Sequence, residues 1–140
     1  MMNNNETTSE DKVNKPDWSG YSILIVEDDF FNFKLLEGWA EMMNANVIRA
    51  EGGQEAVDIC HKNDDVHIVL MDLHLPGMNG YEATRIIKKT RPDLPVIVVT
   101  ANAIEEEKIK SEEAGCDGFI TKPINIKQLT TTVSKLLPRA

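Results

Sequence analysis

Carboxylates follow two apolar runs in this chain, where they could act on a metal ion or a phosphoryl group. Asp72 follows residues 66–71, and the acidic triplet 27–29 (Glu-Asp-Asp) follows residues 21–26. Clustered carboxylates repel one another unless a cation is present, and an all-oxygen site selects a hard ion such as Mg²⁺ or Mn²⁺. A carboxylate beside such an ion can attack phosphorus and form an acyl phosphate. A lone acidic triplet is more often a solvated turn, but its pairing with Asp72 favours a metal site.

A hydroxyl group and an ammonium group follow two further apolar runs. Thr100 directly follows residues 96–99, and Lys122 follows residues 119–121. Phosphoryl transfer depends on positioning and on charge compensation, and these two groups can supply both to phosphoryl oxygens. A single lysine after a strand is usually a surface residue, but its predicted position beside Thr100 favours a functional role. Pro123 comes next, and an X-Pro bond of unusual geometry there would aim the lysine side chain.

Strand and helix patterns alternate along the chain, and these elements must position the chemical groups. Short apolar runs bounded by turn residues predict strands, and amphipathic stretches predict helices. The expected strands cover residues 21–26, 47–50, 66–71, 96–99 and 119–121. The expected helices cover the region of Leu35, Leu36, Trp39, Met42 and Met43, and residues 52–62, 81–90, 103–114 and 126–137. The helix over 103–114 has only a thin apolar stripe, so we expect it to be the most mobile one.

Alternation of this kind predicts βαβ units and an α/β fold. Right-handed crossovers leave few topologies, and we expect a flavodoxin-like, doubly wound five-stranded parallel sheet. The predicted strand order is 2-1-3-4-5, with helices on both faces and a crevice between strands one and three. The acidic triplet and Asp72 would then meet at the carboxyl edge of adjacent strands.

Composition limits the class of protein. Hydrophobic residues make up 41% and charged residues 27% of the 140 residues, as in an ordinary globular domain. The formal net charge of -8 argues against direct nucleic acid binding. No apolar run is long enough to span a membrane and no secretory h-region is present, so we expect a cytoplasmic protein. Cys60 and Cys116 are isolated, which predicts two free thiols.

The beginning of the chain differs in composition from the rest. Residues 1–19 are mostly polar, so we expect a disordered or loosely attached leader, with a single domain over residues 20–138. Trp18 is the exception within the leader, and we expect its indole to pack on the edge of the domain.

Residues 21–137 resemble the receiver domain of two-component response regulators. The resemblance rests on four motifs in this order and spacing: IVEDD, MDLHLPGMNG, VVTA and GFITKP. It implies that Asp72 accepts a phosphoryl group from a sensor histidine kinase or a histidine phosphotransfer protein. It also implies a Mg²⁺ site (or Mn²⁺) formed by Glu27, Asp28, Asp72 and the backbone carbonyl of His74.

The resemblance implies roles for four further positions. Thr100 and Lys122 would bind the phosphoryl group, and Phe119 would be the switch aromatic whose rotamer follows the Thr100 hydroxyl. His74 and Asn102 align with positions that modulate the rate of dephosphorylation. We therefore expect a two-state switch that changes the face made by the fourth helix, fifth strand and fifth helix. The chain would catalyse its own phosphorylation and dephosphorylation, without turnover of external substrates.

Several alternatives stay open. The chain could act as a phosphate sink or relay intermediate, as a free-standing regulator, or as the receiver of a hybrid histidine kinase. An Asp-nucleophile phosphatase of the haloacid dehalogenase type is a rival class, but His74 stands where that family has a second Asp. A flavodoxin would need a polar, uncharged phosphate loop after the first strand, and here that loop is acidic. An inert scaffold is the last alternative. The downstream protein and any phosphorylation-dependent dimer are not identified by the sequence.

Overall fold

Five short runs of aliphatic residues form the sheet in the computed structural model, which describes residues 15–102 and 104–138. The strands are β1 (Ser22–Val26), β2 (Asn46–Ala50), β3 (Ile68–Asp72), β4 (Val96–Thr100) and β5 (Gly118–Thr121). The helices are α2 (Phe30–Met42), α3 (Gly53–Lys62), α4 (Gly80–Thr90), α5 (Glu105–Ala114) and α6 (Ile126–Leu136). All strand pairs are parallel and their order is β2-β1-β3-β4-β5, which confirms the predicted fold class and order.

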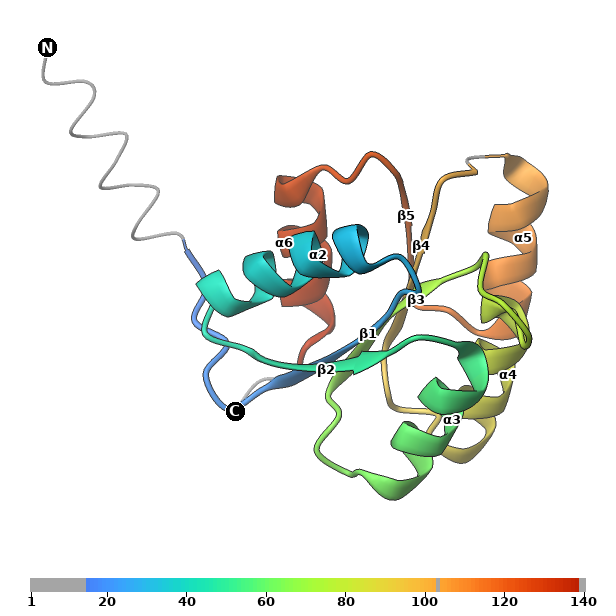
Figure 1. Ribbon diagram of the computed structural model, residues 1–140, viewed down its shortest axis with the longest axis horizontal. Coiled ribbons are helices and arrows are strands. Elements are labelled where there is room, and N and C mark those ends of the chain that lie inside the picture. The colour runs from blue at the N-terminus through green and yellow to red at the C-terminus, as the bar shows by residue number, and fades with distance from the viewer. Residues whose placement is uncertain (1–14, 103, 139–140) are drawn as a thin grey trace, which may run out of the picture.

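The sheet is covered on both faces, because successive side chains of a strand point to opposite sides. Helices α2 and α6 cover one face, and α3, α4 and α5 lie on the other (Figure 1). In β1, Ile23 and Ile25 pack into the core under α2 and α6, whereas Leu24 and Val26 pack into the core under α3 and α4. Strands buried on both faces read as continuous apolar runs, which explains why the sequence pattern predicted them correctly.

Helix α5 buries few side chains against the sheet. It buries only Ser111 and Ala114, while Ile109 is 44% exposed. The predicted thin apolar stripe is therefore confirmed, although the helix begins at Glu105 and the expected start at residue 103 lies outside the described residues. Gly115 ends the helix with a φ of 102°, a left-handed conformation that glycine adopts without steric penalty.

Helix α2 buries only some of the apolar positions from which it was predicted. Leu36, Trp39 and Met43 are buried, but Leu35 and Met42 are 68% and 62% exposed. Positions 35 and 36, and likewise 42 and 43, are adjacent along the helix and therefore about 100° apart around its axis. In each pair one side chain is therefore buried in the core and the other is exposed to solvent.

Trp18 anchors the residues that precede β1. Its side chain is 4% exposed and packs edge-to-face on Trp39, with the ring centroids 5.3 Å apart. The Trp18 N–H donates to the Met43 carbonyl oxygen, and Trp39 Nε1 donates to Oγ1 of Thr130 on α6. The expected packing of Trp18 is confirmed, while most of the expected loose leader lies in residues outside the described part.

Both cysteines are free, as expected: Cys60 is buried and Cys116 is half-buried. Burial raises the pKa of each thiol to about 11, so neither is a reactive thiolate near neutral pH. Among the helices of the described residues, none has the length and apolar character that a membrane span requires.

Candidate functional site

The ends of β1 and β3 bring three carboxylates together. These strands are adjacent and Val26 pairs with Met71. The next residues, Glu27 and Asp72, therefore lie next to each other at the edge of the sheet. One carboxylate oxygen from each of Glu27, Asp28 and Asp72 lies within 4.8 Å of the others. Glu27 and Asp72 are buried and Asp28 is exposed, which leaves the cluster open to solvent on one side.

The electrostatics of this cluster suit a cation. Burial, and then the negative charge of Asp72, raise the pKa of Glu27 above its ordinary value, while Lys122 opposes the shift. The net shift is upward, so the Lys122 ammonium group does not offset the combined effect of burial and the negative charge of Asp72. Oxygen donors with excess negative charge are the ligands that Mg²⁺ prefers, and the residues present therefore fit this ion.

Lys122 connects the end of β5 to the acidic pocket. Its Nζ lies 3.1 Å from Oε1 of Glu27 and 3.7 Å from Oδ2 of Asp72. Its backbone N–H donates to the Thr100 carbonyl oxygen over 2.7 Å, which holds the residue beside the end of β4. The Lys122–Pro123 peptide bond is cis, in agreement with the unusual X-Pro geometry that we expected.

Thr100 is fully buried as the last residue of β4. Its Oγ1 accepts a hydrogen bond from the Asn102 N–H at 3.1 Å. Phe119 is half-buried on the neighbouring strand, where it pairs with Val98. The expected switch pair therefore stands on adjacent strands, with Thr100 at the same edge of the sheet as Asp72 and Lys122.

The loop after β3 is tied to Asp72 and to α5. The His74 N–H donates to Oδ1 of Asp72 at 3.1 Å. The His74 ring extends to α5, where its Nε2 lies 3.6 Å from Oε1 of Glu107. The sequence pattern gave no role to Glu107, because it is one of five glutamates in this helix.

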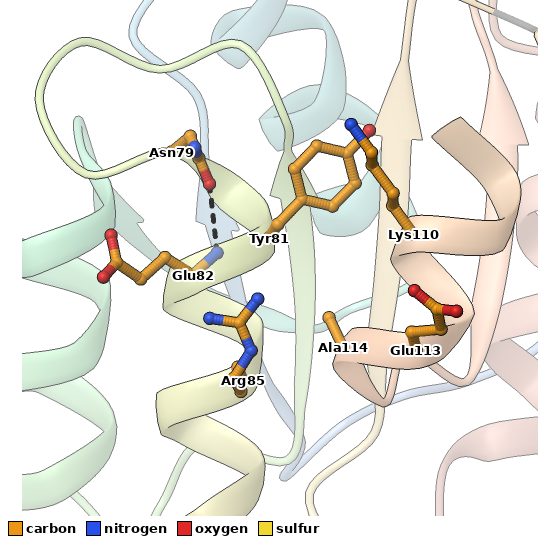
Figure 2. A pocket seen from close by; sticks show the side chains of 7 residues that line it. All are labelled: Asn79, Tyr81, Glu82, Arg85, Lys110, Glu113 and Ala114. Atoms are coloured by element: carbon orange, nitrogen blue, oxygen red, sulfur yellow. Dashed lines mark hydrogen bonds between the residues drawn. The ribbon is translucent and has the colours of Figure 1, made fainter. Parts of the chain in front are cut away.

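Tyr81 is a second residue that the sequence analysis did not assign to the site region. It points from α4 toward α5 in the groove between these helices (Figure 2). Its hydroxyl is buried without a hydrogen-bond partner among the described residues, as is Oε1 of Glu107. Burial, then the charge of Glu107 and its approach as a hydrogen-bond acceptor, and then the charge of Glu106 raise the pKa of Tyr81 to about 12.

The N-terminus of α4 packs directly against the loop that follows β3. The Gly80 N–H donates to the Leu73 carbonyl oxygen at 3.1 Å, and a Cβ at position 80 would collide with the Asp72 carbonyl oxygen. Asn79 caps the helix by accepting from the Glu82 N–H at 3.0 Å (Figure 2). Only glycine fits this approach, so Gly80 fixes the distance between α4 and the end of β3.

Residues 23–134 match the family model of the response regulator receiver domain. The chain belongs to this family. It is 33% identical over 118 residues to the polar-differentiation response regulator DivK of Brucella ovis, covering 83% of this chain and 95% of DivK. It is 38% identical over 116 residues to a cyclic di-GMP phosphodiesterase of Thermotoga maritima and 36% identical over 118 residues to the sensor protein GacS of Pseudomonas syringae. The match to the phosphodiesterase covers 83% of this chain but only 31% of that protein. The match to GacS covers 81% of this chain but only 13% of that protein.

Two solved structures resemble this receiver domain closely. One is the receiver domain of the sensor histidine kinase PA1611 of Pseudomonas aeruginosa, with a magnesium ion coordinated in its active site cleft (28% identity, TM-score 0.78, covering 84% of this chain and 98% of that chain). The other is the Ssk1 receiver domain of Saccharomyces cerevisiae in complex with the histidine phosphotransfer protein Ypd1 (27% identity, TM-score 0.77, covering 85% and 90%). The chain is thus a receiver domain of two-component signalling, and its acidic pocket groups three carboxylates whose oxygens fit Mg²⁺.

Proposed function

We propose that Asp72 is the phosphoacceptor of this receiver domain. The observation that carries the proposal is the position of Asp72: a buried carboxylate grouped with Glu27 and Asp28, with Lys122 Nζ 3.7 Å from its Oδ2. In the transfer, an Asp72 oxygen forms a bond to phosphorus as the phosphorus–nitrogen bond of a phosphohistidine breaks. The electron pair of that bond returns to the imidazole of the donor, which takes up a proton.

Mg²⁺ is the proposed metal of the site, and Mn²⁺ would satisfy the same oxygen ligands. Glu27, Asp28 and Asp72 would hold the ion together with the backbone carbonyl of His74. When bound by these residues, such an ion would supply positive charge to balance the phosphoryl oxygens. Support for this assignment comes from the raised pKa of Glu27, which burial and then the negative charge of Asp72 produce and which Lys122 only partly opposes.

Lys122 and Thr100 are the proposed partners of the phosphoryl oxygens. The Lys122 ammonium group already stands between Glu27 and Asp72, so a small side-chain rotation would bring it to a group on Asp72. Thr100 would offer its hydroxyl from the end of the neighbouring strand, in exchange for its contact with the Asn102 N–H. Each group would form a charge-assisted hydrogen bond, the stronger kind of hydrogen bond in proteins.

The proposed output is a two-state switch in the face formed by α5, β5 and α6. The acyl phosphate adds about two negative charges and three acceptor oxygens at one point. Movement of Thr100 toward this group would leave space for Phe119 to turn inward, and the weakly anchored α5 would shift with it. His74 and Asn102, on either side of the site, would set the rate at which water removes the phosphoryl group.

The proposed phosphoryl donor is a sensor histidine kinase or a histidine phosphotransfer protein. The Ssk1 receiver domain in complex with Ypd1, and the similarity to the sensor protein GacS, support this class of partner. A downstream protein would bind to the α5–β5–α6 face. Phosphorylation-dependent dimerisation through that face is a second proposed output. The proposed compartment is the cytoplasm, where such donors present their phosphohistidine.

Mass spectrometry of the intact protein tests the phosphoacceptor assignment. The protein is incubated with acetyl phosphate and Mg²⁺, beside Asp72→Asn and a sample treated with EDTA. A single phosphoryl adduct that needs Mg²⁺ and disappears in Asp72→Asn is the expected result. An adduct that persists in Asp72→Asn would contradict the assignment, and turnover of an added phosphomonoester would favour the phosphatase class instead. Transfer from phosphorylated histidine phosphotransfer proteins then separates a relay or phosphate sink from a switch.

A further inference from the structure

Arg49 contacts the loop that carries the two acids following β1. It is the fourth residue of β2, where it pairs with Ile25 of β1, and its side chain is 23% exposed. One nitrogen of its guanidinium group, Nη2, donates to the backbone carbonyl oxygens of both Glu27 and Asp28, at 3.2 and 3.3 Å. A single nitrogen on a neighbouring strand thus joins the peptide groups of two residues in the acidic pocket.

The guanidinium group is itself held in place by α2. Its central carbon lies 4.6 Å from the centroid of the Phe33 ring and 5.7 Å from that of Phe30. Nη1 lies 4.0 Å from Oε2 of Glu51. A planar, delocalised cation stacks on aromatic faces and directs its N–H groups rigidly, which a lysine ammonium cannot do. The direction of the two hydrogen bonds is therefore determined by β2 and by the first turns of α2.

The same loop has two other anchors, one at each end. The Glu27 N–H donates to the Ala50 carbonyl oxygen at 3.0 Å, and Asp29 caps α2 by accepting from the Asn32 N–H at 2.9 Å. Between these anchors, the orientation of the two peptide groups decides where the carboxylates of Glu27 and Asp28 point. Arg49 is the side chain that contacts both of those peptide groups.

We infer that Arg49 is a positioning residue that presets the Glu27–Asp28 peptide groups for divalent metal binding. The inference rests on the proposed function, because it assumes that these acids hold the ion. It goes beyond that function, because Arg49 lies outside the four motifs of the family resemblance and touches no reacting atom.

Charge and geometry make opposite predictions for this residue. A positive charge beside an acidic pocket repels Mg²⁺, so an effect of charge alone predicts tighter Mg²⁺ binding when Arg49 is neutralised. A positioning effect predicts weaker Mg²⁺ binding, because the carboxylates must then be ordered at the moment of binding. The sign of the change in affinity therefore separates the two explanations.

Isothermal titration calorimetry with Mg²⁺ alone tests the inference in wild type, Arg49→Lys and Arg49→Gln. Lys34→Gln is the matched control, since Lys34 also lies 5.7 Å from the Phe30 ring but pairs with Glu37 on its own helix. We expect both Arg49 variants to bind Mg²⁺ about tenfold more weakly, as is typical when a metal ligand loses a hydrogen-bond partner. Lys34→Gln is expected to bind as wild type or slightly more tightly.

Phosphorylation by acetyl phosphate gives the second measurement. The Arg49 variants should need about tenfold more Mg²⁺ for half-maximal rate and reach the wild-type rate at saturating Mg²⁺. A structural defect would lower the saturated rate and the melting temperature instead. Unchanged affinity in Arg49→Lys, or tighter binding in Arg49→Gln, would overturn the inference while leaving the proposed function intact. Absence of Mg²⁺ binding by wild type would overturn both.

Discussion

The ammonium group of Lys122 lies 3.1 Å from Oε1 of Glu27 and 3.7 Å from Oδ2 of Asp72. In this arrangement the lysine compensates the most buried of the acids. A divalent cation bound by Glu27 would take over that compensation and free Lys122 for a phosphoryl group on Asp72. Metal binding and phosphoryl binding would thereby be linked through one lysine, because the metal would release Lys122 from Glu27.

Neutralising Lys122 is expected to affect metal affinity and stability in opposite directions. In Lys122→Gln, Mg²⁺ should bind more tightly at about pH 8, because a competing cation is removed from the acidic pocket. The metal-free protein should lose about 2 kcal/mol of unfolding free energy, as a buried carboxylate loses its charged partner. Calorimetry and urea unfolding measure the two quantities, with exposed Lys127→Gln as the control. Weaker Mg²⁺ binding in Lys122→Gln would contradict the proposed competition.

The raised pKa of Glu27 predicts an unusual pH dependence of stability. Burial and the charge of Asp72 raise this pKa above its ordinary value of 4.5, so the folded protein holds the proton more tightly than the unfolded chain. The contribution of Glu27 is therefore fully present below pH 4.5 and is lost as pH rises through the raised pKa. Urea unfolding of metal-free protein across this window should show the loss, and Glu27→Gln should flatten it. Added Mg²⁺ should restore stability above the raised pKa, and a wild-type profile equal to that of Glu27→Gln would refute the assignment.

The sheet and the residues at its edge could be predicted from the sequence because both depend on local patterns. Buried parallel strands are continuous apolar runs, and their carboxyl ends must share one edge, so Asp72, Thr100 and Lys122 could be grouped without a structure. The strand boundaries differ by one or two residues: β3, for example, begins at Ile68 instead of residue 66 and includes Asp72. Such shifts change no assignment, because the register still brings the same residues together.

Contacts between side chains of different elements could not be predicted in the same way. Arg49 reaches Glu27 across 22 positions, and Glu107 approaches His74 across 33 positions. In the sequence both residues are ordinary charged residues in amphipathic or acidic stretches. Their roles depend on which neighbour the fold supplies, and propensity and periodicity contain no information on that point.

Trp18 is expected to contribute strongly to stability although it precedes the first strand. Its side chain is buried against Trp39, so Trp18→Ala should lower the free energy of unfolding by about 3–5 kcal/mol. Trp18→Phe keeps an aromatic ring and should lose less. Urea unfolding followed by far-UV circular dichroism measures both, and Lys15→Ala is a control at an exposed neighbouring position. Equal stability of Trp18→Ala and wild type would mean that the residues before β1 do not belong to the folded unit.

The buried hydroxyl of Tyr81 leads to a prediction of the opposite sign. A buried hydroxyl that has no hydrogen-bond partner lowers stability, because its desolvation is not offset. Within the described residues the Tyr81 hydroxyl has no such partner, and the nearby Oε1 of Glu107 has none either. Tyr81→Phe should therefore keep the wild-type free energy of unfolding or raise it by up to about 1 kcal/mol.

Glu107→Gln provides the matched test of this polar contact between α4 and α5. The amide removes the charge of a carboxylate oxygen that is buried without a hydrogen-bond partner among the described residues, and it adds a donor, so the variant should also be at least as stable as wild type. In the double variant the two gains should not add, because both substitutions act on the same pair of buried oxygens. Urea unfolding of the four proteins gives the coupling directly. A loss of more than about 1 kcal/mol in Tyr81→Phe would show instead that the hydroxyl makes a stabilising hydrogen bond in solution.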